Sequence, residues 1–349
     1  MRKLATIREI TDIQPIEGAD AIEVASVDGW DVVVKKGDFD VNQHVIYLEI
    51  DSWVPHELAP FLTRGENPRE YHGVRGERLR TIKLRGQVSQ GLILPVDVLQ
   101  SIPHTNLPGG YVQYGDHEPI RLFDTASDLT EILNIQKWEA PISAQLRGVQ
   151  KGNFPSDLVP KTDQERIQNC IRDITKRPEQ TYEKSLKLDG SSCTILRLAG
   201  EIRVCSRNME LVISDDNAEN TFVKMALKHQ NSIGEGYAMQ GELMGPGIQG
   251  NRENFKEHKF FVFDIYDMIE RKYLDPLCRR MVCESVGLDH TPILDRSAPA
   301  PSSVKAAIED VDSISSINHK IAEGVVYKSN IDGFSFKVIS NKFLLKEGN

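Results

Sequence analysis

The chain has 349 residues, enough for about two domains, and its 40% hydrophobic and 27% charged residues are an ordinary globular composition. A formal net charge of −9 argues against a uniformly basic nucleic-acid-binding protein, although a local basic groove is still compatible with it. No apolar run approaches the roughly 20 residues that cross a bilayer, so no membrane-spanning helix is predicted.

The first ten residues are charged and lack the apolar core of a signal peptide. The chain has five cysteines, an odd number, and none of their spacings matches a zinc site. We therefore expect reduced thiols and a location in the cytoplasm or another reducing intracellular compartment.

Short β-rich segments dominate the start of the chain. Residues 21–27 and 30–34 flank Asp28-Gly29, a hairpin signal, and residues 45–50 form another predicted strand. This spacing predicts a small barrel or sandwich. The stretch resembles the start of OB-fold modules, which often bind single strands or nucleic-acid backbones.

Basic residues outnumber acidic ones between residues 61 and 92. One interpretation is a surface that follows nucleic-acid phosphates, and the other is a solvated loop with an outer strand face. The residues alone leave both open. The candidates for a phosphate-binding surface are Arg78, Arg80, Lys83 and Arg85.

Loop-forming residues mark the end of this region, and residues 131–154 show little periodicity. We predict an OB-like nucleic-acid-binding domain over residues 1–130, a linker over 131–154 and a second domain over 155–349.

Thr162-Asp163-Gln164-Glu165 matches a capping box, which predicts that a helix starts there. Apolar residues between 167 and 174 fall on one helical face behind it. Arg166 lies off that stripe. It is either a surface arginine, which the residues alone favour, or a phosphate contact near the helix start.

The central stretch of the chain is Lys187-Leu188-Asp189-Gly190. On a strand, Lys187 and Asp189 would share a face, because strand side chains repeat every two residues. A lysine beside a carboxylate can act as a nucleophile, and Gly190 permits a tight bend and the close approach of a phosphate or sugar. An isolated match also suits an ordinary turn at a strand end.

Further candidates follow the lysine. Residues 193–198 and 202–206 are predicted to form a hairpin that Arg207 closes, and a helix is predicted over 217–228. Glu242 lies in an apolar strand before a glycine-rich turn, where a carboxylate needs a partner or a ligand.

Phe263 belongs to an almost wholly apolar strand, residues 260–267, and periodicity favours core packing over stacking on a base. Residues 271–315 are predicted to form two helical segments around a proline-rich loop at 292–301. Two more strands are predicted at 323–328 and 334–339.

Six short motifs follow one another at ordered intervals. They read Lys187-x-Asp189-Gly190, Arg207, Gly241-Glu242, Phe263-Asp264, Glu323-Gly324 and Lys337. Over roughly residues 155–345 this order resembles the motif set of the covalent nucleotidyltransferases: DNA ligases, RNA ligases and mRNA capping enzymes. With the OB-like module and residues 160–169 ahead of the lysine, the chain most resembles the Deinococcus-type ATP-dependent RNA ligases.

The resemblance implies a role for each matching residue. Lys187 would attack the α-phosphorus of ATP and form a covalent lysyl-adenylate, next to Gly190 in the ATP site. Asp189 and Glu323 would hold hydrated Mg²⁺ or Mn²⁺, and Glu242 would contact the ribose or the waters of that metal. The other implied contacts are Arg207 to the sugar or phosphates, Phe263 to adenine, Lys337 to the α-phosphate and Arg166 to an ATP or RNA phosphate.

Two positions depart from this pattern. Many RNA ligases have a second lysine two residues after the last motif lysine, where this chain has Ile339, and Lys342 is the candidate replacement. Some relatives carry an acidic residue directly before the nucleophile to recognise the adenine amino group, and here it is Leu186. Adenine recognition would then rest on stacking and backbone contacts.

The implied chemistry requires a lowered lysine pKa, because about one free lysine in a thousand is neutral near pH 7.4. Carboxylates alone stabilise the ammonium form and raise the pKa. A divalent cation held by Asp189 and Glu323 would reverse the local field, and Lys337 would add positive charge. Oxygen ligands and retained waters suit Mg²⁺ or Mn²⁺.

The resemblance implies an α+β chain, in which an N-terminal OB-like β-barrel precedes an antiparallel-sheet nucleotidyltransferase domain of the ATP-grasp-like ligase type. It implies an ATP-dependent RNA ligase that seals 5′-phosphate and 3′-hydroxyl ends at nicks in duplex RNA or RNA–DNA hybrid, as a monomer without a membrane partner. The alternatives are a DNA ligase, a GTP-dependent capping-type enzyme, or a non-catalytic OB-type RNA-binding protein. The intact Lys187, Asp189, Glu242 and Glu323 argue against the last.

Overall fold

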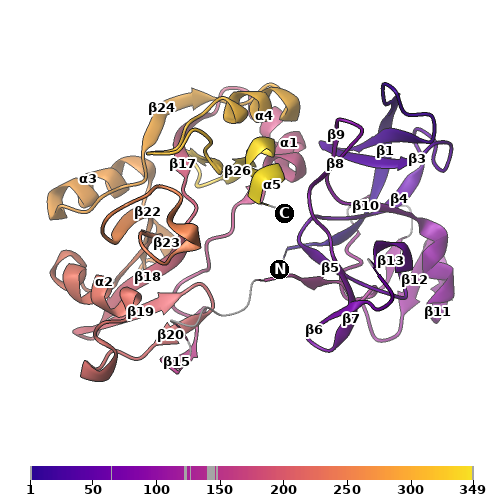
Figure 1. The fold of residues 1–349 in the computed structure, drawn as a ribbon. Coiled ribbons are helices and arrows are strands. Elements are labelled where there is room, and N and C mark those ends of the chain that lie inside the picture. The colour runs from indigo at the N-terminus through magenta and orange to yellow at the C-terminus, as the bar shows by residue number, and fades with distance from the viewer. Residues whose placement is uncertain are drawn as a thin grey trace. The chain divides into compact units, whose positions relative to one another are not determined.

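The computed structural model describes residues 2–63, 65–121, 124–125, 127–139, 146 and 148–347. The chain divides into two compact units (Figure 1). The first comprises residues 1–140 with 344–349, and the second comprises residues 141–343. Each unit has its own β-sheets and its own buried apolar clusters.

A curled antiparallel sheet with the strand order β10-β4-β1-β2-β3 forms the start of the first unit. Its edges approach each other, because the Gln90 N–H beside β10 donates to the Asp31 carbonyl of β3 over 2.8 Å. The result is an OB-like half-barrel around a buried cluster that contains Trp30 and Tyr47. The strands are β1 (Ala5–Pro15), β2 (Ile22–Val27), β3 (Trp30–Lys35), β4 (His44–Leu48) and β10 (Leu92–Pro95).

Three smaller sheets complete the first unit, with the orders β14-β5-β7-β6, β11-β12-β13 and β8-β9. Leu133 and Ile135, from the segment predicted as a linker, lie in the core of this unit, and β14 pairs with β5. The strands are β5 (Ser52–Pro55), β6 (Arg69–Tyr71), β7 (Val74–Arg78), β8 (Ile82–Leu84), β9 (Gln87–Ser89), β11 (His104–Leu107), β12 (Tyr111–Tyr114), β13 (Ile120–Arg121) and β14 (Gln136–Lys137).

The second unit contains two sheets, one of seven strands in the order β15-β20-β19-β18-β21-β22-β23 and one of five in the order β16-β26-β25-β17-β24. The first comprises β15 (Gln150–Asn153), β18 (Ser191–Leu198), β19 (Glu201–Ser206), β20 (Met209–Leu211), β21 (Tyr237–Met244), β22 (Lys259–Asp267) and β23 (Lys272–Tyr273). The second comprises β16 (Glu165–Arg166), β17 (Thr181–Lys187), β24 (Ile293–Pro299), β25 (Gly324–Ser329) and β26 (Ser335–Ile339). The expected α+β class, an OB-like unit followed by an antiparallel-sheet domain, is confirmed.

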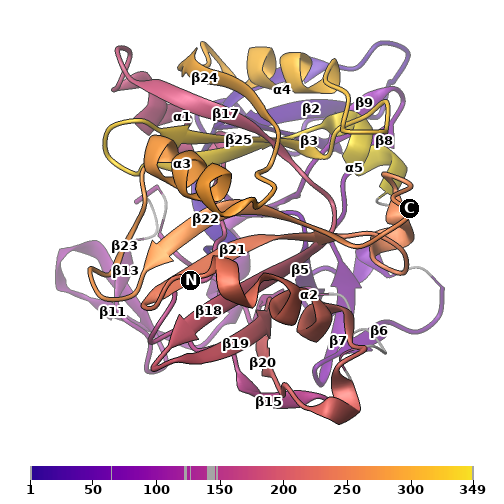
Figure 2. The ribbon, with the colours of Figure 1, turned by 90° about the vertical axis from the view of Figure 1, so that its left-hand side faces the viewer.

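Helices cover one face of each sheet in the second unit. Residues of α2 and α3 share a buried cluster with the seven-stranded sheet, and both helices lie over that sheet in Figure 2. Residues of α1 and α4 share another cluster with the five-stranded sheet. The helices of the second unit are α1 (Ile167–Thr175), α2 (Thr221–His229), α3 (Pro276–Val286) and α4 (Val304–Asp312). The last helix, α5 (Asn341–Glu347), begins in this unit and continues into the residues assigned to the first.

The uncovered faces of these two sheets carry the polar residues. Tyr182, Tyr327 and Phe336 pack under α1 and α4, so the alternation of strand side chains places Lys187, Lys328 and Lys337 on the opposite face. Contacts such as Lys328 to Asp264 of β22 then join the two sheets.

A β-bulge in β22 changes this alternation. Gln240 of β21 faces Asp264, but the next residue, Gly241, faces Val262, so Phe263 is the extra residue. Val262 and Ile265 therefore both enter the apolar core, while Phe263 stays half-buried. The bulge explains why simple periodicity misplaced Phe263 in the core.

Two local predictions are wrong. Helix α1 begins at Ile167 after the N-cap Arg166, without a side-chain cap, so residues 162–165 form no capping box. Glu165 and Arg166 instead pair in parallel with Phe336 and Lys337 of β26. The predicted loop at 292–301 contains β24, an edge strand that pairs with β17. No helix in the described residues is long and apolar enough to cross a membrane.

Candidate active site

Lys187 ends strand β17 and faces a carboxylate. Its register partner is Gly324 of β25, and its Nζ donates to Glu323 Oε1 over 2.5 Å. A side chain at position 324 would not fit, because an added Cβ would lie 2.3 Å from the Val338 carbonyl oxygen. The close strand packing at Gly324 thus places Glu323 beside Lys187.

Gly190 and Glu242 form the other side of this cluster. The Gly190 N–H donates to Glu242 Oε1 over 2.9 Å, and a Cβ on Gly190 would lie 2.5 Å from the Leu243 carbonyl oxygen. Burial and the charge of Glu323 together raise the pKa of Glu242 to about 8, although the nearby Lys187 ammonium lowers it. The site therefore disfavours the negatively charged form of the Glu242 carboxylate in the ligand-free chain.

The electrostatic balance at Lys187 favours the ammonium form in the ligand-free chain. Burial would lower the pKa of Lys187, but the charges of Glu323 and Glu242 outweigh it, and the net shift is upward. The protein residues alone therefore keep the amine protonated. A nucleophilic role requires that positive charge reach these carboxylates.

The carboxylates fit a hydrated divalent cation. Glu323 Oε2 is buried and has no hydrogen-bond partner among the described residues, so an electropositive partner is missing there. Asp189 lies beside the turn after β17, with its Oδ2 3.7 Å from Arg252 Nη1. Within the described ranges, no three His, Cys, Asp or Glu side chains converge tightly enough to bind a bare ion. Contacts through retained waters suit this arrangement.

Further cations of the second unit come from β26 and from the turn after β19. Lys337 of β26 donates from Nζ to Asp163 Oδ1 over 2.9 Å, and Arg207 Nη2 lies 3.4 Å from Asp163 Oδ2. Burial and the charges of Lys187 and Arg166 together lower the pKa of Lys337 to about 8, although Asp163 opposes the shift. Arg166 is buried beside Lys337 in the register, so the surface interpretation of Arg166 is wrong.

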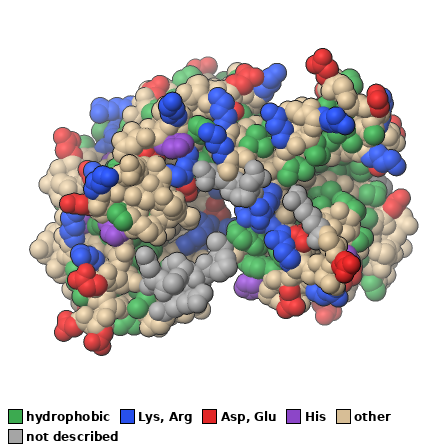
Figure 3. Space-filling model, in the orientation of Figure 1, with side chains coloured by type: hydrophobic (Ala, Val, Ile, Leu, Met, Phe, Trp, Pro, Cys, Tyr) green, Lys and Arg blue, Asp and Glu red, His purple; other side chains and the backbone are tan. Residues whose placement is uncertain are grey.

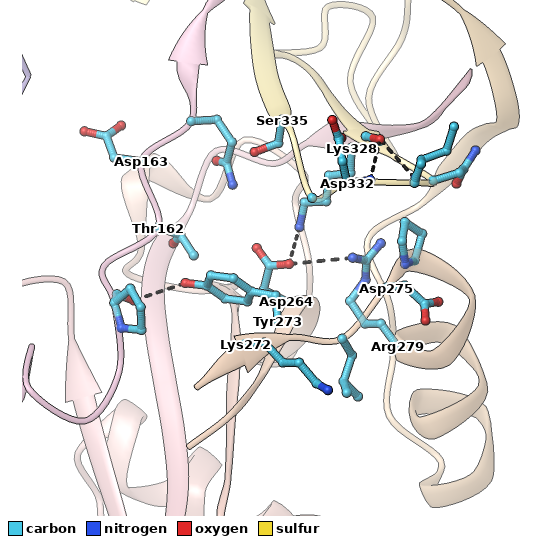
Figure 4. A pocket seen from close by; sticks show the side chains of 18 of the residues that line it. Thr162, Asp163, Asp264, Lys272, Tyr273, Asp275, Arg279, Lys328, Asp332 and Ser335 are labelled. Carbon is cyan, nitrogen blue, oxygen red and sulfur yellow. Dashed lines mark hydrogen bonds and ion pairs between the residues drawn. The ribbon is translucent and has the colours of Figure 1, made fainter. Parts of the chain in front are cut away.

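A buried charge network continues from this site between the two sheets. Lys328 Nζ lies 2.6 Å from Asp264 Oδ1 and 5.8 Å from the centre of the Phe263 ring. Arg279 of α3 contacts Asp264 (Figure 4). It also pairs with Glu183 of β17. The network anchors α3 to both sheets behind Phe263.

Replacing Arg279 with methionine should lower the free energy of unfolding by about 3 kcal/mol, because two buried carboxylates lose a cation. Denaturant titration of the wild type and the variant measures this difference. Lys272→Met is the matched control, since Lys272 is exposed and forms an ion pair with Glu270, which is exposed as well. Equal transition midpoints for Arg279→Met and the wild type would show that the network contributes no net stability.

A cavity of about 520 Å³ borders this network and the segment before β16. Asp163, Asp264, Tyr273, Lys328 and Ser335 are among its lining residues (Figure 4). Asp163 both lines this cavity and contacts Lys337 of the site.

Not every predicted site residue joins the cluster. Lys342, on α5, is exposed, and its Nζ donates to the Asp312 carbonyl over 3.0 Å, so the structure does not place it with Lys187. Ile339, the position without a second lysine, is buried opposite Gly324.

The four candidates for an RNA-phosphate surface in residues 61–92 all lie in the first unit. Arg78 of β7 pairs with Asp51 over 2.6 Å and stacks on Trp138 at 3.7 Å. Arg80 follows that strand. Lys83 and Arg85 are exposed on the β8–β9 hairpin. On the face drawn in Figure 3, basic and acidic side chains are interspersed over both units.

Two residues at the site were missed as functional candidates. Arg252 lies beside Asp189 and contacts the Phe343 ring at 4.7 Å, and Asp163 joins Lys337 to Arg207. From the sequence, Asp163 was placed in a helix cap and in the family segment 160–169, without a role of its own. The sequence signal for a functional Asp163 is its position just before Arg166, for which a phosphate contact is one of the two interpretations.

The two units also match known protein families separately. A model of an OB-fold domain matches residues 4–96, and a model of the RNA ligase family matches residues 181–339. A comparison with curated protein sequences gave no match.

Solved structures of one protein resemble nearly the whole chain. The chain is similar to Naegleria gruberi RNA ligase in a Glu-to-Ala variant with AMP and Mn, at 39% identity and a TM-score of 0.82, covering 99% of this chain and 100% of that one. A Lys-to-Ala variant of the same ligase with ATP and Mn is 38% identical over 99% and 100% of the two chains, with a TM-score of 0.82. The Naegleria ligase with PPi is 40% identical over 99% and 98%, with a TM-score of 0.80.

The OB-like half-barrel, the antiparallel-sheet domain and the lysine among carboxylates define a ligase of the covalent nucleotidyltransferase class. Within this class, the similarity to an RNA ligase extends over 99% of the chain at 39% identity. The chain belongs to the RNA ligase family.

Proposed function

We propose that this chain is an ATP-dependent RNA ligase that seals 5′-phosphate and 3′-hydroxyl ends at nicks in duplex RNA or RNA–DNA hybrid. The observation that carries the proposal is the ion pair of Lys187 with Glu323, beside Glu242 and within the same site as Lys337. The Naegleria ligase structures with ATP, AMP and Mn support the choice of nucleotide and metal.

The site residues have separate roles in the first step, the transfer of AMP from ATP to Lys187. The Lys187 amine attacks the α-phosphorus of ATP, so a P–N bond forms while the bond to the β-phosphate oxygen breaks and pyrophosphate leaves. Lys337, Arg207 and Arg166 neutralise phosphate charge, and Phe263 presents a half-buried ring to the adenine. Positioning and charge neutralisation supply most of the catalysis in phosphoryl-transfer chemistry of this kind.

Asp189, Glu323 and Glu242 are the residues that would hold hydrated Mg²⁺ or Mn²⁺. When bound, the ion neutralises phosphate charge and lowers the pKa of the nearby amine. Without it, Glu323 and Glu242 hold Lys187 protonated. Lys187 is therefore inactive as a nucleophile until both metal and nucleotide are present.

Two further transfers follow at the same site. The AMP moves from Lys187 Nζ to the RNA 5′-phosphate, which releases the lysine and creates a 5′–5′ pyrophosphate linkage. The neighbouring 3′-hydroxyl then attacks the RNA phosphorus, the phosphodiester bond forms, and AMP leaves. The same cations neutralise phosphate charge in each transfer.

Label transfer tests the proposal. Protein stripped of bound AMP is incubated with α-labelled ATP and Mg²⁺ or Mn²⁺, denatured, and examined for label on the protein band, with GTP in parallel. Label from ATP supports the proposed enzyme, whereas RNA binding without label under any metal favours a non-catalytic OB-type protein. Nicks with ribose or deoxyribose at the 3′-hydroxyl end then separate an RNA ligase from a DNA ligase.

The OB-like unit is the proposed RNA platform. Lys83 and Arg85 are exposed on the β8–β9 hairpin, whereas Arg78 is already engaged by Asp51 and Trp138. Long basic side chains in water contact phosphates without a large desolvation cost. Substitutions of Lys83 and Arg85 therefore test this surface more directly than a substitution of Arg78.

Replacing Lys83 and Arg85 together with alanine should weaken binding of nicked duplex RNA and reduce the slope of log affinity against log salt by about two. Lysine adenylation should stay at the wild-type level. Filter binding across a salt series measures the slope. Lys35→Ala with Lys36→Ala removes the same charge from exposed positions of the same unit and is the control. An unchanged salt slope in the hairpin variant would place the RNA elsewhere.

A further inference from the structure

A short segment of the second unit bridges both sheets next to the nucleotide site. This segment, residues 160–164, is called the strap. The Pro160 carbonyl accepts from Gln240 Nε2 at 2.9 Å and from the Tyr273 hydroxyl at 3.3 Å, and both donors belong to the seven-stranded sheet. The strap then enters β16, which pairs with β26 of the five-stranded sheet. Thr162 and Asp163 of the strap lie at the edge of the cavity in Figure 4.

The Asp163 carboxylate lies between two cations from different sheets. Its Oδ1 accepts from Lys337 Nζ over 2.9 Å, and its Oδ2 lies 3.4 Å from Arg207 Nη2. The Lys337 side chain is only 12% exposed, compared with 31% for Asp163 and 46% for Arg207. A mostly buried lysine is thus satisfied by a carboxylate on a strap that water still reaches.

We propose that Asp163 occupies the position of a nucleotide phosphate in the ligand-free enzyme and is displaced when the nucleotide binds. This inference rests on the proposed function, in which Lys337 and Arg207 bind phosphate. A carboxylate and a phosphate oxygen offer these donors the same kind of charge-assisted hydrogen bond. The two anions therefore compete for one pair of cations.

This arrangement has two consequences for binding. Asp163 keeps Lys337 and Arg207 charged and oriented before the nucleotide arrives, so less of the binding energy is lost in ordering them. It also opposes binding, because a ligand must bring an anion to replace the carboxylate. Adenosine brings none, so the competition acts on AMP and ATP and leaves the bare nucleoside unaffected.

The experiment compares AMP with adenosine on full-length protein that has first been stripped of covalent AMP with pyrophosphate. Calorimetry gives the dissociation constant of each ligand for the wild type and for Asp163→Asn. The variant should bind AMP about fivefold more tightly, the gain expected from removing one competing ion-pair partner, and adenosine equally well. A general structural defect would weaken both ligands, so tighter AMP binding alone is diagnostic.

Two variants serve as controls. Glu165→Gln removes the same charge two residues further along, where the carboxylate is exposed and accepts from Asn169, and its AMP affinity should equal that of the wild type. Asp163→Glu keeps the competing carboxylate and should also bind AMP as the wild type does. Thermal melting checks that each variant is folded.

Unchanged or weaker AMP binding by folded Asp163→Asn would overturn the proposal, and so would an equal gain for adenosine or for Glu165→Gln. Failure of the proposed function gives a different result: wild-type protein would then take no label from ATP. A wild type that adenylates normally, beside an Asp163→Asn variant without tighter AMP binding, would reject the competition and retain the ligase.

Discussion

Replacing Lys187 with methionine is expected to abolish covalent labelling by α-labelled ATP, with a loss of at least about 10³-fold. Methionine retains most of the side-chain volume but has no amine to form the P–N bond. Substrate binding by the other residues cannot compensate, because every later step needs the AMP that Lys187 carries. Label on the denatured protein band, followed over time at saturating ATP and Mn²⁺, measures the effect.

Lys184→Met is the matched control for this result. Lys184 lies on the same strand but on the opposite face, where its Nζ pairs with Asp310 of α4 over 2.5 Å. Its loss should leave labelling near the wild-type level. If Lys187→Met were labelled at the wild-type rate, another residue would be the nucleophile and the proposed mechanism would be wrong.

Replacing Glu323 with glutamine should reduce the adenylation rate by about 100-fold and raise the Mn²⁺ concentration needed for half-maximal rate. Two effects oppose each other in this variant. Loss of the carboxylate lowers the Lys187 pKa, because Glu323 now raises it. Loss of the metal contact removes charge neutralisation at the phosphate. We expect the second effect to dominate, since the neutral lysine gains little without a metal beside the phosphate.

A metal titration distinguishes these effects. Rates are measured over a range of Mn²⁺ concentrations for the wild type, Glu323→Gln and Glu309→Gln, whose carboxylate is exposed on α4. Glu309→Gln should follow the wild-type curve. A Glu323→Gln curve that keeps the wild-type midpoint would show that Glu323 does not hold the ion.

The positions of the main site residues could be predicted because local spacing and chain order both constrain them. A lysine at a strand end followed by aspartate and glycine required only a turn, and the structure provides it with Gly190 against Leu243. The segment at Asp163 could not be predicted in this way. Its residues fit a helix cap locally, but pairing of β16 with β26 competes for the same backbone. The contact between Asp163 and Lys337 joins residues that are 174 positions apart, so no local sequence pattern indicates it.

The same reason explains the error at β24. A proline-rich segment predicts a loop. An edge strand, however, pairs on one side only and needs fewer backbone N–H donors, so it tolerates proline. β24 is such a strand, at the edge of the sheet beside β17. Phe263 shows a different limit. One extra residue in β22 shifts the alternation, and no simple period detects a single insertion.

The strand order of the five-stranded sheet has a consequence for synthesis of the chain on the ribosome. Strand β17 carries the nucleophile, yet both of its neighbours, β24 and β25, are translated more than 100 residues later, and Glu323 follows Lys187 by 136 residues. Contacts this distant in sequence form late. Until β24 and β25 have been synthesised, β17 therefore lacks both of its neighbours and Lys187 lacks Glu323. Unpaired strand edges of this kind favour misassociation of incomplete chains.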